Sequence, residues 1–145
     1  MNRYPGREIL LVDDTASDVN LVKIILEELD FAGRLEVVSD GEEALAFLHR
    51  KGAYQNRRRN QLPDLILLDL HMPQMDGFEV LKQLKETARM VRLPVIILSA
   101  FDNDEEASKA YSMGAGGYIV KPTNFLQLKE KLEGILAFWF QESIH

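Results

Sequence analysis

The sequence has no cysteine among its 145 residues, which excludes a disulfide framework and any metal site built on thiolates. It also lacks long apolar runs, and no window approaches the roughly 18 apolar residues of a membrane-spanning helix. Basic residues are in the minority, with 17 Lys and Arg against 23 Asp and Glu, so the formal charge is −6. A general binder of nucleic acid or membrane surfaces needs a positive field, and the charge argues against both functions.

The N-terminal segment lacks a secretory pattern, because its apolar run is too short and charged residues follow at once. The composition is that of one globular domain, with 46% hydrophobic and 28% charged residues. We therefore expect a single-domain cytoplasmic protein.

Short apolar runs alternate with segments of helical periodicity along the whole chain. Strands are expected at residues 9–12, 34–40, 64–70, 93–100 and 117–121. Helices are expected at 17–29, 41–51, 75–86, 103–114 and about 123–140, with a loop at 52–63. Alternating strands and helices predict an α/β fold, a parallel sheet with helices on both faces.

Polar residues stand at the carboxyl ends of four of the expected strands. They are Asp13 and Asp14 after the first strand, Asp69 in the third, Ser99 in the fourth and Lys121 in the fifth. Functional groups of parallel sheets gather at this edge, so these side chains are expected to converge on one crevice.

Three carboxylates in one small site repel one another unless a cation neutralises them. Oxygen ligands without a His or Cys cluster suit a hard ion such as Mg²⁺. A lysine and a hydroxyl complete a site for a phosphoryl group, whose oxygens the metal and Lys121 would neutralise and Ser99 would hydrogen-bond. Asp69 is the best candidate for a carboxylate nucleophile, because it sits alone on a central strand.

Each of these residues also has a purely structural explanation. An Asp pair after a strand often caps the next helix, and Asp69 could cap the end of its own strand. Lys121 and Pro122 could form a turn, and Ser99 alone indicates little. These explanations account poorly for the joint placement at four strand ends.

The chain resembles the receiver domain of two-component response regulators in four motifs, "VDD" at 12–14, "LLDLHMPQMDG" at 67–77, "LSA" at 98–100 and "GAGGYIVKP" at 114–122. The resemblance covers residues 7 to about 136 and implies a flavodoxin-like fold with strand order 2-1-3-4-5. The last expected helix extends beyond this receiver core, to about residue 140. We expect one stand-alone receiver over residues 1–145, without an output domain.

The resemblance also implies a role for each matching residue. Asp69 is the phosphoacceptor and a metal ligand, Asp14 binds Mg²⁺ directly, and Asp13 acts through a bound water. The backbone carbonyl of His71 is a further metal ligand, and its side chain is expected to face solvent near the pocket. A base or metal-ligand role for that side chain is the alternative.

The resemblance assigns the remaining roles at the other strand ends. Ser99 is the switch hydroxyl, Lys121 contacts the phosphoryl group, and the Lys121–Pro122 bond is expected to be cis. Tyr118 is the switch aromatic, unless it is an ordinary half-buried strand residue.

Two regions depart from a typical receiver. The loop at 50–63 is long and carries Arg57, Arg58 and Arg59, which form either a solvated loop or a partner-binding patch. Helical spacing places one stripe of the last helix on the sheet: Phe125, Leu128, Leu132, Ile135, Leu136 and Trp139. Phe138 and Phe140 flank that stripe, as packing at the helix end or as an exposed patch, and we assign them to an interface.

The long loop and the tail resemble the cyanobacterial phytochrome-associated response regulators, which are single-domain receivers that dimerise. The implied function is phosphoryl acceptance from a histidine kinase, of phytochrome type, by a homodimer formed through the face of helix 4, strand 5 and helix 5. A pseudo-receiver that binds partners without phosphorylation is the alternative. A phosphatase is disfavoured, because His71 stands where a second acid is expected. We therefore expect that the chain accepts a phosphoryl group and dephosphorylates itself, but is not a turnover enzyme.

Overall fold

The computed structural model describes residues 2–56, 62–72, 75–121 and 124–141. Strands and helices alternate along these residues as the sequence predicts. They are β1 (Glu8–Val12), α1 (Ala16–Glu28), β2 (Arg34–Val38), α2 (Gly41–His49), η1 (Gly52–Tyr54), β3 (Leu65–Asp69), α3 (Gly77–Glu86), β4 (Val95–Ser99), α4 (Asp104–Ser112), β5 (Gly117–Val120) and α5 (Phe125–Trp139). The expected loop at 52–63 thus begins with a short 3₁₀ turn.

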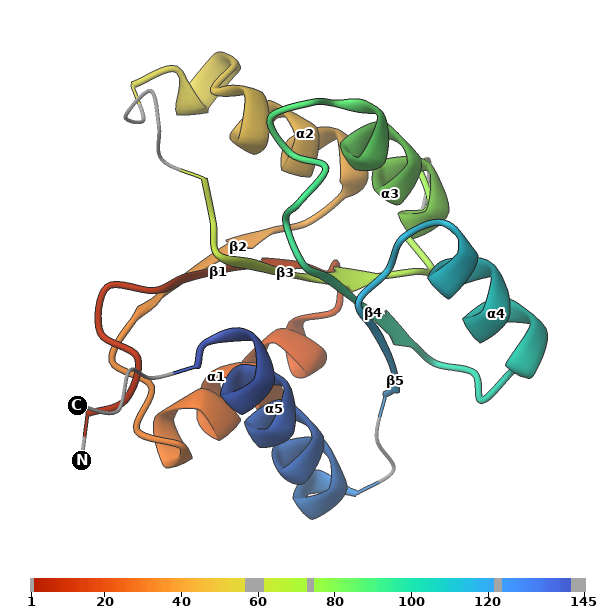
Figure 1. The fold of residues 1–145 in the computed structure, drawn as a ribbon. Helices are drawn as coiled ribbons and strands as arrows, with labels where there is room; N and C mark the ends of the chain where they lie inside the picture. The colour runs from red at the N-terminus through yellow and green to blue at the C-terminus, as the bar shows by residue number, and fades with distance from the viewer. Residues whose placement is uncertain (1, 57–61, 73–74, 122–123, 142–145) are drawn as a thin grey trace.

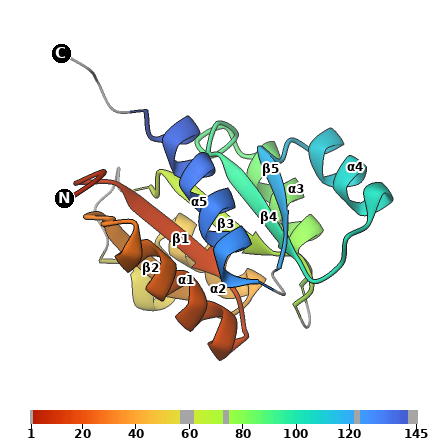
Figure 2. The ribbon, with the colours of Figure 1, turned by 90° about the horizontal axis from the view of Figure 1, so that it is seen from below.

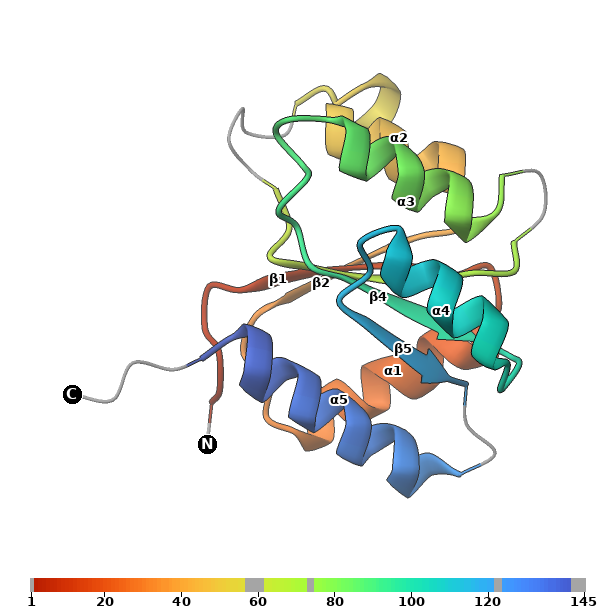
Figure 3. The same ribbon diagram turned by 45° about the vertical axis from the view of Figure 1, so that its right-hand side comes forward.

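The five strands form one parallel sheet in the order β2-β1-β3-β4-β5. Helices α2 and α3 cover one face, and α4 lies beside β5 on the same side (Figures 1 and 3). Helices α1 and α5 cover the other face, as the view from below shows (Figure 2). The predicted flavodoxin-like fold with strand order 2-1-3-4-5 is therefore confirmed.

The hydrophobic core has two layers, one on each face of the sheet. Along β1, Leu10 and Val12 join the layer under α2 and α3, whereas Ile9 and Leu11 join the layer under α1 and α5. Strands β3 and β4 alternate in the same way, because successive side chains of a strand point to opposite faces. Strands buried on both faces explain the continuous apolar runs in the sequence.

The end of α5 differs from its predicted pattern. Leu128, Leu132 and Leu136 are buried as expected, but Trp139 is 36% exposed. The assignment of Phe140 to an interface is wrong, because this residue is 1% exposed. Its ring centroid lies 5.7 Å from that of Tyr4. Phe140 lies four residues after Leu136, and its amide donates to the Leu136 carbonyl at 2.8 Å. It therefore continues the buried row of α5, because residues four apart share a helix face.

Gly77 brings the start of α3 against the end of β3. A Cβ at this position would lie 2.8 Å from the Asp69 carbonyl oxygen and 2.8 Å from the Leu70 Cα. The Gly77 amide donates a hydrogen bond to the Leu70 carbonyl at 3.0 Å. Only glycine allows this approach, which fixes the backbone that carries Asp69.

Two predictions of the sequence analysis lie outside the described residues, namely the Arg57–Arg59 loop and the cis bond before Pro122. None of the helices in the described part of the chain combines the length and apolar composition that crossing a bilayer requires.

Candidate functional site

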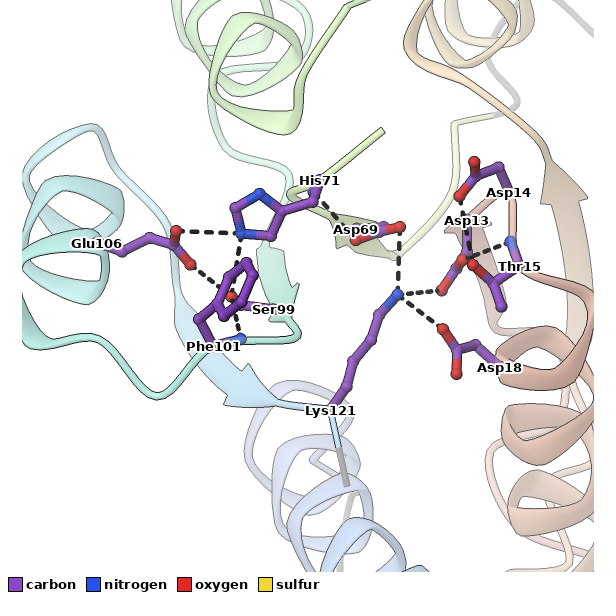
Figure 4. A network of polar contacts seen from close by, with 10 residues as sticks. All are labelled: Asp13, Asp14, Thr15, Asp18, Asp69, His71, Ser99, Phe101, Glu106 and Lys121. Carbon is purple, nitrogen blue, oxygen red and sulfur yellow. Dashed lines mark hydrogen bonds and ion pairs between the residues drawn. The ribbon is translucent and has the colours of Figure 1, made fainter. Parts of the chain in front are cut away.

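The carboxyl ends of β1 and β3 bring three carboxylates together (Figure 4). Oxygen atoms of Asp13, Asp14 and Asp69 lie within 4.8 Å of one another. Asp13 and Asp69 are each 2% exposed, whereas Asp14 is exposed. Buried carboxylates so close together need positive charge, because their mutual repulsion is poorly screened.

Asp13 and Asp69 divide their oxygens in the same way. One oxygen of each accepts a hydrogen bond from the backbone amide two residues on, from Thr15 at 2.9 Å and from His71 at 3.1 Å respectively. The other oxygen faces Lys121, whose Nζ lies 3.1 Å from Asp13 and 3.2 Å from Asp69. Neither Asp13 nor Asp14 caps α1, whose N-cap is Thr15 and has no side-chain cap hydrogen bond. One oxygen of Asp13 and of Asp69 is held by the local backbone, and the other faces Lys121.

Lys121 follows β5 and is shared among three carboxylates. Its third partner is Asp18 in the first turn of α1, at 2.8 Å from Nζ. Burial alone would lower the pKa of Lys121, but Asp18, Asp13 and Asp69 outweigh it and raise the pKa, so the side chain stays charged. We call Lys121, Asp13, Asp18 and Asp69 the lysine-centred cluster.

This edge of the sheet carries more negative than positive charge. With Asp14, which lies beside Asp13 and Asp69, the described site contains four carboxylates and one ammonium group. Asp13 Oδ2 is buried and accepts no hydrogen bond in the described structure, although it lies within ion-pair distance of Lys121. Burial raises the pKa of Asp13, chiefly because desolvation penalises its charged form. An under-paired buried oxygen among carboxylates fits a hard divalent cation.

Ser99 does not point its hydroxyl at these carboxylates. Its Oγ donates to Oε1 of Glu106 on α4 at 2.5 Å and accepts from the Phe101 amide at 3.1 Å. The Tyr118 hydroxyl lies 2.7 Å from the same Glu106 oxygen and 2.6 Å from the Phe101 carbonyl. Glu106 therefore gathers both predicted switch residues around one carboxylate oxygen.

His71 links the two parts of the site. Its backbone amide donates to Asp69, while its Nε2 lies 3.1 Å from Glu106 Oε2 and 3.4 Å from Ser99 Oγ. Its side chain is 41% exposed and meets the Phe101 ring edge-on, at 4.9 Å between centroids. The expected solvent-facing side chain is thus partly exposed but directed at Glu106. We call Glu106, Ser99, Tyr118 and His71 the glutamate-centred cluster.

The pKa values in the glutamate-centred cluster follow from this pairing. Burial would raise the pKa of Glu106, but hydrogen bonds from Ser99 and Tyr118 and the proximity of His71 outweigh it and lower the pKa. Burial raises the pKa of Tyr118, and the Glu106 carboxylate adds to the increase. Glu106 is therefore an ionised acceptor and Tyr118 a neutral donor.

The structure brings together Asp13, Asp14, Asp69 and Lys121 as the sequence predicts, and it places Ser99, Tyr118 and His71 in the neighbouring cluster. Sequence reasoning missed Asp18 and Glu106. Asp18 lies in the first turn of the helix that follows the first strand, and such a turn lies at the carboxyl edge of the sheet. Glu106 follows other acids in "DNDEE", and nothing in the spacing distinguishes it.

Comparisons with known proteins agree on one family. The family model described as response regulator receiver domain matches residues 9–133. Response regulator Rcp1 from a Synechocystis species is 36% identical over 137 residues, 94% of this chain and 91% of that protein.

Solved structures extend the likeness to the fold. The phosphorylated cyanobacterial phytochrome response regulator RcpA has a TM-score of 0.84 at 36% identity, over 96% of this chain and 97% of that one. The Mn²⁺-bound form of Rcp1 has a TM-score of 0.83 at 34% identity, over 96% and 98%.

Proposed function

We propose that this chain, which belongs to the response regulator receiver domain family, is a response regulator that accepts a phosphoryl group on Asp69. One observation carries the proposal. Asp69 is a buried carboxylate whose free side faces an ammonium group at 3.2 Å and two further carboxylates within 4.8 Å. A phosphoryl acceptor needs this combination, a fixed nucleophile beside groups that neutralise the incoming oxygens.

The proposed donor is the phosphohistidine of a histidine kinase. Oδ2 of Asp69 forms the new bond to phosphorus as the bond to the imidazole nitrogen breaks, and the released nitrogen takes up a proton. The His71 amide holds Oδ1 during this step, and Lys121 neutralises charge on the transferring oxygens. Asp14 and Asp69, Asp13 through a water, and the His71 carbonyl would hold Mg²⁺, which supplies further charge neutralisation when bound.

The proposed output is a change of surface. A phosphoryl group adds about −1.5 to −2 charge at Asp69, and Ser99 would donate to it. As the switch aromatic, Tyr118 would turn inward on phosphorylation. Its side chain is already half-buried against the core and hydrogen-bonded to Glu106, so this turn amounts to a redirection of the hydroxyl. The surface of α4, β5 and α5 would then change its affinity for a partner.

The proposed kinase is of the phytochrome type, acting in the cytoplasm. The similarity to a phytochrome response regulator over nearly the whole chain supports this partner. The intact lysine-centred cluster argues against a pseudo-receiver. A turnover phosphatase is disfavoured because His71, two residues after the acceptor, directs its side chain at Glu106.

We further propose a homodimer through the face of α4, β5 and α5. Phe138 is 62% exposed and stacks edge-on against Trp139, with 5.0 Å between ring centroids. Trp139 in turn covers Gly116, directly before β5. Phe138→Ala should shift a dimer toward monomer in sedimentation without loss of folding. Phe140→Ala should instead lower the free energy of unfolding by about 3 kcal/mol, because it leaves a cavity at a core position.

The test of phosphoryl acceptance uses acetyl phosphate with Mg²⁺ and intact-mass spectrometry. The wild type should gain one phosphoryl group, and Asp69→Asn should gain none. Asp104→Asn on the exposed start of α4 is the matched control and should be labelled like the wild type. Labelling retained in Asp69→Asn would contradict the assignment of Asp69 as the phosphoacceptor. Size-exclusion chromatography of the same samples shows whether phosphorylation changes the oligomeric state.

A further inference from the structure

Helices α2 and α4 begin with the same capping pattern but use it differently. In α2, the Asp40 side chain accepts from the Glu43 amide at 2.8 Å, and the Glu43 carboxylate accepts from the Ser39 amide at 3.0 Å. This pair is a variant of the capping box that stabilises helix starts, in which the glutamate accepts from the residue before the N-cap. In α4, Asn103 accepts from the Glu106 amide at 2.9 Å, as the pattern predicts. The Glu106 carboxylate, however, does not return to its own helix start.

Both oxygens of Glu106 reach residues outside α4 instead. Oε1 lies at hydrogen-bond distance from Ser99 at the end of β4 and from Tyr118 in β5, and Oε2 lies 3.1 Å from His71. The side chain is 14% exposed, so water competes little for these contacts. A residue at a helix-capping position thus connects α4 to the carboxyl ends of the strands (Figure 4).

The Ser99 hydroxyl has a single proton, and it donates this proton in a hydrogen bond to Glu106. The lone pairs of the same oxygen face the Phe101 amide. Ser99 therefore has no proton left to donate to an acceptor on Asp69 while Glu106 holds it.

We propose that Glu106 is a positioning residue that competes with phosphorylated Asp69 for the Ser99 hydroxyl, an inference that rests on the function proposed above. Phosphorylation exchanges one anionic acceptor for another at Ser99 Oγ. Tyr118 shares the same Glu106 oxygen, so the exchange also frees an acceptor site for its hydroxyl. The first turn of α4 loses its tie to β4 in the same step.

Beryllofluoride with Mg²⁺ tests the competition, because it mimics a phosphoryl group on an aspartate without chemical turnover. Glu106→Gln keeps the shape but offers a neutral acceptor, and hydrogen bonds to neutral acceptors are weaker. Beryllofluoride should bind Glu106→Gln about fivefold more tightly than the wild type, the difference expected between a charged and a neutral acceptor. Fluorine NMR of bound beryllofluoride measures the affinity, and circular dichroism confirms folding.

Two further variants separate positioning from a general charge effect. Glu105→Gln removes the same charge from the neighbouring, exposed position of α4 and should leave the affinity unchanged. In a Ser99→Ala background, Glu106→Gln should have no effect, because the shared proton is gone. Glu106→Asp keeps the charge on a shorter side chain and should also tighten binding, as a second route to the same result.

The outcomes distinguish the two proposals. Tighter binding by Glu106→Gln that vanishes in Ser99→Ala supports the competition. Equal affinity of wild type and Glu106→Gln, or an equal gain in both backgrounds, overturns it and leaves phosphoryl acceptance intact. Wild type that binds no beryllofluoride and takes no phosphoryl group from acetyl phosphate overturns the function and the competition together.

Discussion

The lysine-centred and glutamate-centred clusters are opposites in charge. In the first, one ammonium group is shared among the carboxylates of Asp13, Asp18 and Asp69. In the second, one carboxylate is shared among Ser99, Tyr118 and His71. The two meet at His71, whose backbone serves the first and whose ring serves the second.

The difference teaches which cluster can accept a ligand and which must rearrange. The lysine-centred cluster has fewer cationic than anionic groups, so a metal or a phosphoryl–metal pair would complete it. The glutamate-centred cluster already pairs each of its oxygens, so it changes only when a contact breaks. In the function proposed above, binding therefore belongs to one half of the site and switching to the other.

The largest expected effect comes from removing the only cation of the lysine-centred cluster. Lys121→Ala leaves two buried carboxylates unpaired, and we expect a loss of about 3 kcal/mol in the free energy of unfolding without metal. Urea denaturation in the presence of a chelator measures it. Lys129→Ala, which breaks an exposed pair with Glu28, is the control and should cost about 0.5 kcal/mol. Equal losses in the two variants would mean that the cluster needs no cation.

The second prediction concerns Mg²⁺ itself. At tenfold its dissociation constant, Mg²⁺ should stabilise the wild type by about 1.4 kcal/mol, because it binds only the folded state. Thermal unfolding with MgCl₂ against KCl at equal ionic strength measures the shift. Asp13→Asn should reduce it, whereas Glu106→Gln should keep it. A loss of the Mg²⁺ shift in Glu106→Gln would show that the two clusters do not act separately.

The third prediction is a pH dependence in the glutamate-centred cluster. The pKa of Glu106 is lowered by folding from its ordinary 4.5, so its stabilisation is present above that value and lost as pH falls through the lower folded pKa. The free energy of unfolding of the wild type should exceed that of Glu106→Gln by about 1 kcal/mol at pH 7. This difference should disappear in acid. Paired urea titrations from pH 7 to pH 3 follow the gap. A gap that stays constant would contradict an ionised Glu106.

The smallest expected effect is at Asp18. Its side chain is 29% exposed, and Lys121 keeps Asp13 and Asp69 without it. Asp18→Asn should therefore cost about 0.5 kcal/mol, as partly exposed pairs do. The same denaturation series measures it, beside Glu28→Gln as a control. A loss as large as that of Lys121→Ala would make Asp18 the residue that fixes the lysine.

The fold was predictable because its periodicities are strong and local. The continuous apolar runs of β1, β3 and β4 indicate strands buried on both faces, and the helical spacing of α1 and α3 records which helix face is buried. The carboxyl-edge residues Asp13, Asp69 and Lys121 were predictable because parallel strands bring their ends together. The end of α5 was harder to predict, because the expected stripe included Trp139, whereas the buried row runs in four-residue steps through Leu136 to Phe140.

The partners of Lys121 and Ser99 were harder to predict, because they depend on side-chain direction between elements. Asp18 and Glu106 both lie in first turns of helices, where acidic residues are common for local reasons. A local preference hides a long-range contact when both favour the same residue type. Only the placement of α1 and α4 against the sheet distinguishes the two causes.

The glycine at the start of α3 gives the site a mechanical direction. Gly77 sets the start of α3 so close to Asp69 and Leu70 that no side chain would fit between them. On the other side, α4 is joined to the end of β4 by side-chain hydrogen bonds that can exchange. We therefore expect a rearrangement at Asp69 to displace α4 and β5, while α3 keeps its position.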